Sequence, residues 1–160
     1  GLGQGAQPII SYNYGAKNTQ RVKKTFKLLL FSSLCYSVLL WACVQLFPRA
    51  FAAMFTSDEA LLSFTAPALR IYTAVLCLFG IQTACQMTFT SLGRAKESIA
   101  VAVVRKFVLL LPLIYLLPAV LPMDDTMAVY TAEPVADLIA ILFTAVLFAF
   151  RFKHALKKLA

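Results

Sequence analysis

Long uncharged, apolar runs alternate with short charged segments along the chain. Leu28 to Phe47 contains 20 residues without a formal charge, and Ile71 to Gly93 contains 23. At about 1.5 Å per helical residue, each run is long enough to cross a hydrocarbon core of about 30 Å. The pattern therefore predicts transmembrane helices over 28–47 and 71–93.

The remaining runs are shorter and need their neighbours to span a membrane. Phe107 to Met123 has 17 uncharged residues, and adding the segment before it predicts a helix over 98–122. Leu138 to Phe150 has only 13, so we expect this helix to begin near Thr126 and to cover 126–150. This fourth helix would carry acidic residues inside the membrane.

The first residues read as the end of another helix. Gly1 to Tyr14 is rich in Gly and Gln and contains Pro8, a composition closer to a packed transporter helix than to a lipid-facing one. The chain opens on Gly1 and lacks the charged and apolar regions of a signal peptide. We therefore expect a fragment in which 1–14 ends a truncated helix.

Charge gives an independent test of these spans, because short cytoplasmic loops are rich in Lys and Arg. The segments between the predicted helices alternate in sign: basic, acidic, basic, acidic, basic. Only a membrane-crossing fourth helix gives this alternation, which places the C-terminus and the basic tail 151–160 in the cytoplasm. The segment after Ser57 predicts a short interfacial helix on the outer face. The residues behind the alternation are Lys17, Arg21, Lys23, Lys24, Lys27; Asp58, Glu59; Arg94, Lys96; Asp124, Asp125; Arg151, Lys153, Lys157 and Lys158.

Composition supports the class of protein. Hydrophobic residues make up 61% of the 160 positions and charged residues 14%, with a mean hydropathy of +0.79. A soluble domain has about 25% charged residues, so we predict an all-α, polytopic transmembrane bundle in the lipid bilayer. The net charge of +8 comes from residues at the ends of apolar runs, which favours lipid headgroups over nucleic acid as the partner.

Two acidic residues are the candidates for cation or proton coupling. Glu133 and Asp137 are four positions apart and share one helical face. A charge inside the bilayer costs at least about 2.5 kcal/mol, so it normally faces a bundle interior or a wet cavity. Two close carboxylates also tend to share a proton. The alternative is that Glu133 reaches headgroups and Asp137 bonds neighbouring backbone.

Prolines and amides add candidates for shape and for substrate contact. Pro134 and Pro112 lack a backbone donor and are predicted to kink their helices. Gln82 and Gln86 lie on one face of the helix over 71–93. Such amides line a cavity or hold helices together, and Gln4 and Gln7 near the start of the chain allow the same two interpretations.

Two arginines border the membrane in the predicted topology. Arg70 lies at an outer helix end and Arg105 about seven residues inside an inner end. We expect both side chains to extend to lipid headgroups, with an ion pair from Arg105 to Asp137 as the alternative.

The sequence offers little for enzyme chemistry. His154 is the single histidine, so a histidine metal cluster or a Ser-His pair is not predicted, and no phosphate-binding loop of the GxxxxGK[ST] type occurs. We expect no enzyme activity, no metal and no cofactor, and any work to come from a gradient of protons or sodium ions.

Several segments resemble the multidrug and toxic compound extrusion (MATE) family. Gln4 to Asn18, reading QGAQPIISYNYGAKN, is similar to the end of the eighth helix of that family and the loop after it. Gln86 through Lys96, with Arg105 and PLIY at 112–115, resembles the tenth helix, the next loop and the eleventh helix. Glu133 to Asp137, reading EPVAD, is similar to the start of the twelfth.

The resemblance implies the last five helices of a twelve-helix antiporter with two six-helix lobes, whose N-terminal lobe would be the partner of this one. Such proteins export cationic or amphipathic drugs in exchange for protons or sodium ions by alternating access. Coupling carboxylates lie on the first helix in one branch of the family and on the seventh and tenth in another. The equivalent of the tenth, 71–93, carries no acid.

We therefore expect a multidrug antiporter in a bacterial plasma membrane. One rival is a related flippase for lipid-linked oligosaccharides, whose cavity would be rich in Arg and Lys to hold a diphosphate. The other is a structural membrane subunit that transports nothing.

Overall fold

The computed structural model describes residues 1–122 and 124–158, and nearly all of them are helical. The last two positions of the predicted basic tail, 159–160, lie outside the described residues. In chain order the elements are α1 (Leu2–Gly15), α2 (Thr19–Leu46), α3 (Pro48–Ala53), α4 (Glu59–Tyr72), η1 (Leu76–Leu78), α5 (Phe79–Ser91), α6 (Ala95–Val103), η2 (Val104–Leu110), α7 (Leu111–Val120) and α8 (Asp125–Lys157).

Three helical segments are long and apolar enough to cross a membrane: Thr19–Leu46, Ala95–Val120 and Asp125–Lys157. A fourth span results if α4 and the helix after it, Leu76–Ser91, are counted together, although they are bent by 42° at the break. The all-α transmembrane architecture expected from the sequence is confirmed.

The helix ends differ from the sequence expectation in three places. α2 begins at Thr19, so most of the basic loop expected before residue 28 is the first part of that helix. α4 begins at Glu59, and the helix expected to start at residue 71 is interrupted there instead. α8 extends to Lys157, so the described part of the basic tail is mainly helical. Polar residues continue these helices because backbone hydrogen bonds are retained beyond the apolar run.

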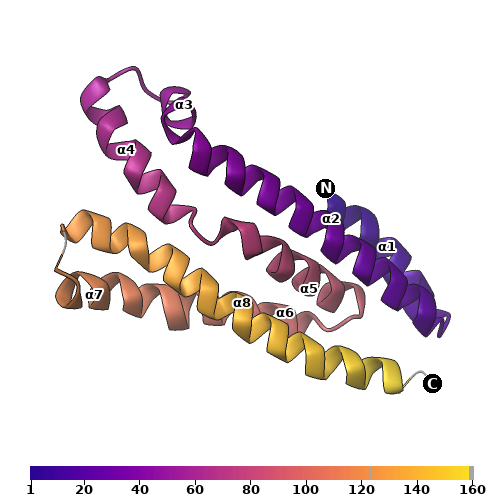
Figure 1. Ribbon diagram of the computed structural model, residues 1–160. Helices are drawn as coiled ribbons and strands as arrows, with labels where there is room; N and C mark the ends of the chain where they lie inside the picture. The colour runs from indigo at the N-terminus through magenta and orange to yellow at the C-terminus, as the bar shows by residue number, and fades with distance from the viewer. Residues whose placement is uncertain (123, 159–160) are drawn as a thin grey trace.

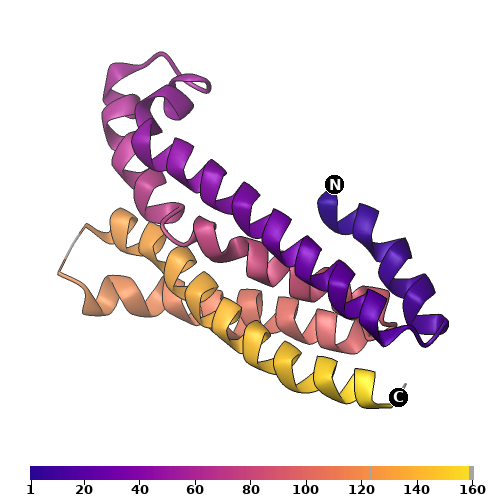
Figure 2. The same cartoon turned by 45° about the vertical axis from the view of Figure 1, so that its right-hand side comes forward.

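The spans run side by side with their connections at two ends of the bundle (Figures 1 and 2). The α1–α2 turn, the α5–α6 turn and the C-terminal end of α8 lie at one end; the α2–α4 connection and the α7–α8 turn lie at the other (Figure 1). The basic connections thus share one end and the acidic ones the other, as the charge alternation predicted.

The α1–α2 turn is built from its own sequence. α1 ends at Gly15, Lys17 adopts a φ of 56°, and the Asn18 side chain accepts a hydrogen bond of 3.1 Å from the Arg21 N–H. Asn18 therefore caps α2 and satisfies one of its free backbone donors. The turn expected over these residues is present.

The centre of the bundle is packed with small and aromatic side chains. Gly80 on α5 lies so close to α2 that a Cβ placed on it would stand 2.6 Å from the Ser33 carbonyl carbon and oxygen. Only glycine fits this approach. Toward the basic end, Phe26, Phe148 and Phe152 stack with ring centroids 4.6 to 5.2 Å apart.

Candidate functional site: a charge cluster beside two irregular helices

Four charged side chains from two helices meet within the bundle. The Arg105 Nε donates to Asp137 Oδ1, and its Nη2 donates to Glu133 Oε1 at 3.2 Å. Lys106 Nζ lies 3.4 Å from the same Glu133 oxygen. We call Arg105, Lys106, Glu133 and Asp137 the charge cluster; its formal charges sum to zero.

The charge cluster is sheltered from its surroundings. The side chains of Arg105, Glu133 and Asp137 are 18%, 12% and 16% exposed, whereas Lys106 is 50% exposed. Pairing offsets the cost of placing these charges in an apolar environment. The expectation that Arg105 extends to headgroups is therefore wrong, because two carboxylates from α8 lie within its reach; the ion pair to Asp137 is present.

The two basic residues stand on a widened helical turn. Val104–Leu110 forms a π-helix, and the Leu111 N–H donates to the Lys106 carbonyl, five residues back. A π-turn is wider than an α-turn, so adjacent side chains point in more similar directions, and Arg105 and Lys106 both reach Glu133. Pro112 follows directly and cannot donate to Val108, which favours irregular bonding just before it.

The two carboxylates stand on a continuous helix. α8 is helical from Asp125 to Lys157 and contains Pro134, which is buried. The helical assignment is unbroken at this proline, so any kink there is accommodated without a gap in α8. Glu133 and Asp137 face the same neighbour, as their four-residue spacing predicted.

A second irregular segment lies beside the cluster. Between α4 and α5 the chain leaves the α-helix at Thr73 and returns through the short η1. The guanidinium carbon of Arg105 lies 5.3 Å from the centre of the Phe79 ring, the first residue of α5. This cation–π contact adds an attraction that does not need a second charge. Tyr72, the last residue of α4, interacts electrostatically with Glu133, Asp137 and Arg105.

α2 satisfies the backbone groups that the break leaves free. The Trp41 indole N–H donates to the Ala74 carbonyl at 3.0 Å, and Gln45 Nε2 donates to the Arg70 carbonyl at 2.9 Å. Arg70 Nε in turn donates to the Gln45 carbonyl at 3.1 Å, so this side chain is held by α2. Buried backbone groups need such partners, which explains why an interrupted helix is stable here.

Next to the break lies a cavity of about 620 Å³ between α1, α2 and α5. Its wall is mostly apolar, and its polar groups are hydroxyls and one amide. Among the described residues that line it there is no Lys or Arg. Phe79 lines this cavity and also contacts Arg105, so it connects the cavity to the charge cluster. The polar lining side chains are Gln4, Ser33, Tyr36, Ser37 and Thr83.

The amides predicted to contact substrate separate into different environments. Gln4 lines the cavity, whereas Gln7, Gln82 and Gln86 do not line it. Gln82 is 3% exposed, and its Oε1 has no hydrogen-bond partner among the described residues.

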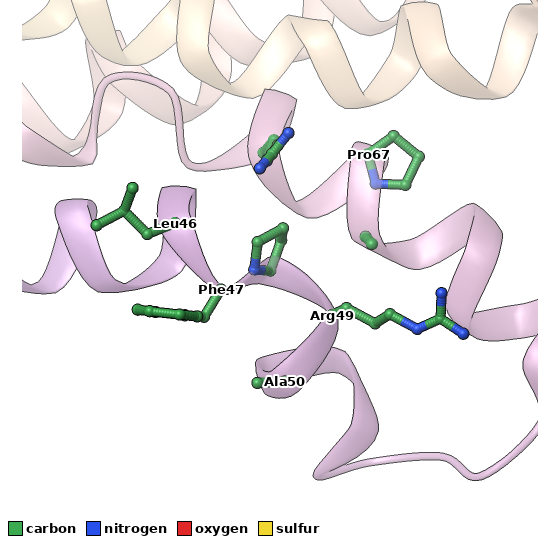
Figure 3. A pocket seen from close by; sticks show the side chains of 8 residues that line it. Leu46, Phe47, Arg49, Ala50 and Pro67 are labelled. Atoms are coloured by element: carbon green, nitrogen blue, oxygen red, sulfur yellow. The ribbon is translucent and has the colours of Figure 1, made fainter.

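A further hollow of about 430 Å³ lies at the acidic end, between the start of α3 and the middle of α4. Figure 3 shows Leu46, Phe47 and Arg49 around the α2–α3 junction, with Pro67 of α4 opposite them. Arg49 is paired with Glu59. None of the residues predicted as sites from the sequence lines this hollow.

Sequence reasoning missed several residues of the site. Phe79 and Lys106 were not singled out, nor were Trp41 and Gln45. Two of them carried a signal: Trp41 is the single tryptophan of the chain, and Gln45 is the one amide in the apolar run 28–47. Their role depends on a break in another helix, which the sequence did not reveal.

The fold and the paired intramembrane charges define a polytopic helical membrane protein of the kind found in secondary transporters. The sequence profile of the MatE family matches residues 1–116. The chain belongs to the MATE family.

Solved structures agree with this assignment. The structure of the MATE multidrug transporter DinF-BH in complex with rhodamine 6G is 30% identical, with a TM-score of 0.85, and the match covers 97% of this chain and 34% of that one. An inward-facing multidrug resistance MATE family transporter of the MOP superfamily matches with a TM-score of 0.85 at 18% identity, over 96% of this chain and 35% of that one. The chain thus spans about a third of these structures. Comparison with curated protein sequences gave no match.

Proposed function

We propose that this chain is part of a secondary active exporter of cationic or amphipathic compounds, driven by exchange for protons or sodium ions. The observation that carries the proposal is the position of Phe79, which lines an apolar cavity on one side and contacts Arg105 on the other. Occupation of the cavity can therefore act on the charge cluster through a single side chain.

The chemistry of coupling follows from charge balance. Arg105 and Lys106 neutralise Glu133 and Asp137 in the present conformation. When Arg105 moves away, the carboxylates need another positive charge, because an unpaired charge in this environment is costly. A proton or a sodium ion supplies it. Alternation between these two states is the kind of exchange that an antiporter with alternating access requires.

The cavity supports an amphipathic cargo. Its apolar wall favours an aromatic or aliphatic body, and its hydroxyl and amide groups hydrogen-bond a polar part. A flippase for a diphosphate-linked oligosaccharide would need basic side chains at the cargo, and those that line this cavity include none.

The test is transport by the full-length protein with Asp137→Asn, measured as efflux of a fluorescent rhodamine dye from vesicles under an imposed proton or sodium gradient. We expect efflux driven by the coupling gradient to fall at least about tenfold, since the neutral amide no longer binds a cation. Asp125→Asn, on the same helix and exposed, is the matched control and keeps wild-type rates. Normal expression with unchanged transport in Asp137→Asn would remove Asp137 from the mechanism.

A further inference from the structure

Four lysines surround an apolar groove at the basic end of the bundle. The groove has a volume of about 620 Å³ and lies between the N-terminal part of α2 and the C-terminal part of α8. Its rim carries two lysines from each helix, all of them exposed. They are Lys23, Lys27, Lys153 and Lys157.

No acid of the described residues neutralises this rim. None of the four lysines takes part in an ion pair within the described part of the chain. α2 contains no Asp or Glu, and the last acid of α8 is Asp137, about four turns before Lys153. Four like charges held close together repel one another, so the groove gains when an anion binds among them.

The floor of the groove is apolar and already ordered. Phe26 and Leu30 line it from α2, and Phe152 lines it from α8. Phe26 and Phe152 stack on each other at 5.2 Å and each stacks on Phe148. Rigid aromatic side chains lose little entropy when another apolar group packs on them.

The groove also lies at the boundary between apolar and charged sequence. Lys27 is the last charged residue before the apolar run 28–47, and Arg151 is the first after the run 138–150. Both helices end their membrane-spanning part here, and they do so at the same end of the bundle (Figure 2). A ligand in the groove would thus place one part among lysines and another against apolar side chains within the membrane.

We propose that this groove is a binding site for an anionic phospholipid of the cytoplasmic leaflet. Its phosphate lies among the four lysines, and one acyl chain lies against Phe26, Leu30 and Phe152. The excess of Lys and Arg identifies this end of the bundle as cytoplasmic. Basic pockets between membrane helices on this side suit anionic headgroups, and each lysine near an anionic surface strengthens binding roughly fivefold. The proposal is independent of the transport cycle.

The first experiment measures lipid binding by the full-length protein in detergent, with native mass spectrometry and added phosphatidylglycerol or phosphatidylcholine. Replacing Lys23, Lys27, Lys153 and Lys157 by Gln is expected to weaken phosphatidylglycerol binding at least about tenfold. The matched control replaces Arg21, Lys24, Arg151 and Lys158 by Gln, two residues near each of the same helix ends that do not line the groove. The control changes the net charge equally and should bind nearly as tightly as the wild type.

A second experiment keeps the test valid if the groove variant does not fold. Wild-type protein is labelled with phosphatidylglycerol that carries a photoreactive group in one acyl chain, and the labelled peptides are mapped. We expect labels on the segments around Phe26 and Phe152, which added phosphatidylglycerol prevents and added inorganic phosphate does not. Equal losses in both glutamine variants, labels outside the groove, or cross-links between the Lys27 side chains of two copies would each overturn the proposal.

Discussion

The contact of α2 with α5 and the contact of η2 with α8 hold the same bundle together by different means. The first depends on close approach: Gly80 leaves no room for a Cβ beside the Ser33 backbone. The second depends on charge: Arg105 and Lys106 pair with Glu133 and Asp137 across a widened turn. Ion pairs can exchange a partner for a proton or a metal ion, whereas a backbone contact cannot, so only the second interface is suited to switching.

Exposure separates the two regions further. In the most apolar part of Ala95–Val120 only 6% of residues are buried, compared with 22% for Thr19–Leu46 and 28% for Asp125–Lys157. The span that carries Arg105 and Lys106 therefore has few packing contacts within this chain, and its ion pairs with α8 account for much of its specific attachment.

The largest expected effect comes from removing the shared cation. Arg105→Gln leaves two carboxylates with only the half-exposed Lys106 as partner, which should destabilise the protein by about 3 kcal/mol. Thermal unfolding of the full-length protein in detergent measures this loss. Arg105→Gln combined with Glu133→Gln and Asp137→Asn should regain most of it, because no charge then lacks a partner. No regain in the triple variant would show that the arginine acts by packing alone.

The next effect tests the other interface. Gly80→Ala should destabilise by about 2 kcal/mol, because the new Cβ meets main-chain atoms of α2 that cannot rotate away. The same unfolding measurement applies, and the loss should be the same with or without the charge-cluster variants, since the two contacts share no residue. A loss that depends on Arg105 would mean that the two interfaces are coupled.

The smallest effect refines the steric argument. A Cβ on Gly3 of α1 would lie 2.6 Å from the Met87 Cγ, which is as close as the contact at Gly80. The neighbour here is a flexible side chain that can change rotamer, so Gly3→Ala should cost less than about 1 kcal/mol. Equal losses at the two glycines, in parallel unfolding experiments, would refute the distinction between backbone and side-chain neighbours.

Much of the fold could be predicted from the sequence. The apolar runs placed the spans, and the charge alternation placed the connections at the correct ends of the bundle. Glu133 and Asp137 stood out because an acid inside an apolar helix requires a partner. The partner itself was harder to identify: Arg105 is 28 and 32 positions away from the two acids and was expected to reach the membrane surface.

Hydropathy did not reveal the break between α4 and α5. The apolar run 71–93 continues across its second part, yet the chain bends there by 42°, since Trp41 and Gln45 of α2 satisfy backbone carbonyls at the interruption. The π-helix before Pro112 was likewise hidden, although the proline itself was noted as a source of irregularity. Such features depend on which hydrogen-bond partners another helix supplies.

The sequence by itself determined which segments span the membrane, which end of the bundle is basic, and which acids lie within it, because partition between lipid and water depends on composition over one local stretch. The tertiary structure alone decided that Arg105 joins two helices, that Phe79 separates a cavity from the charges, and that four lysines from α2 and α8 share one groove. These relations arise between residues far apart in the chain, where the distance is set by how the helices pack.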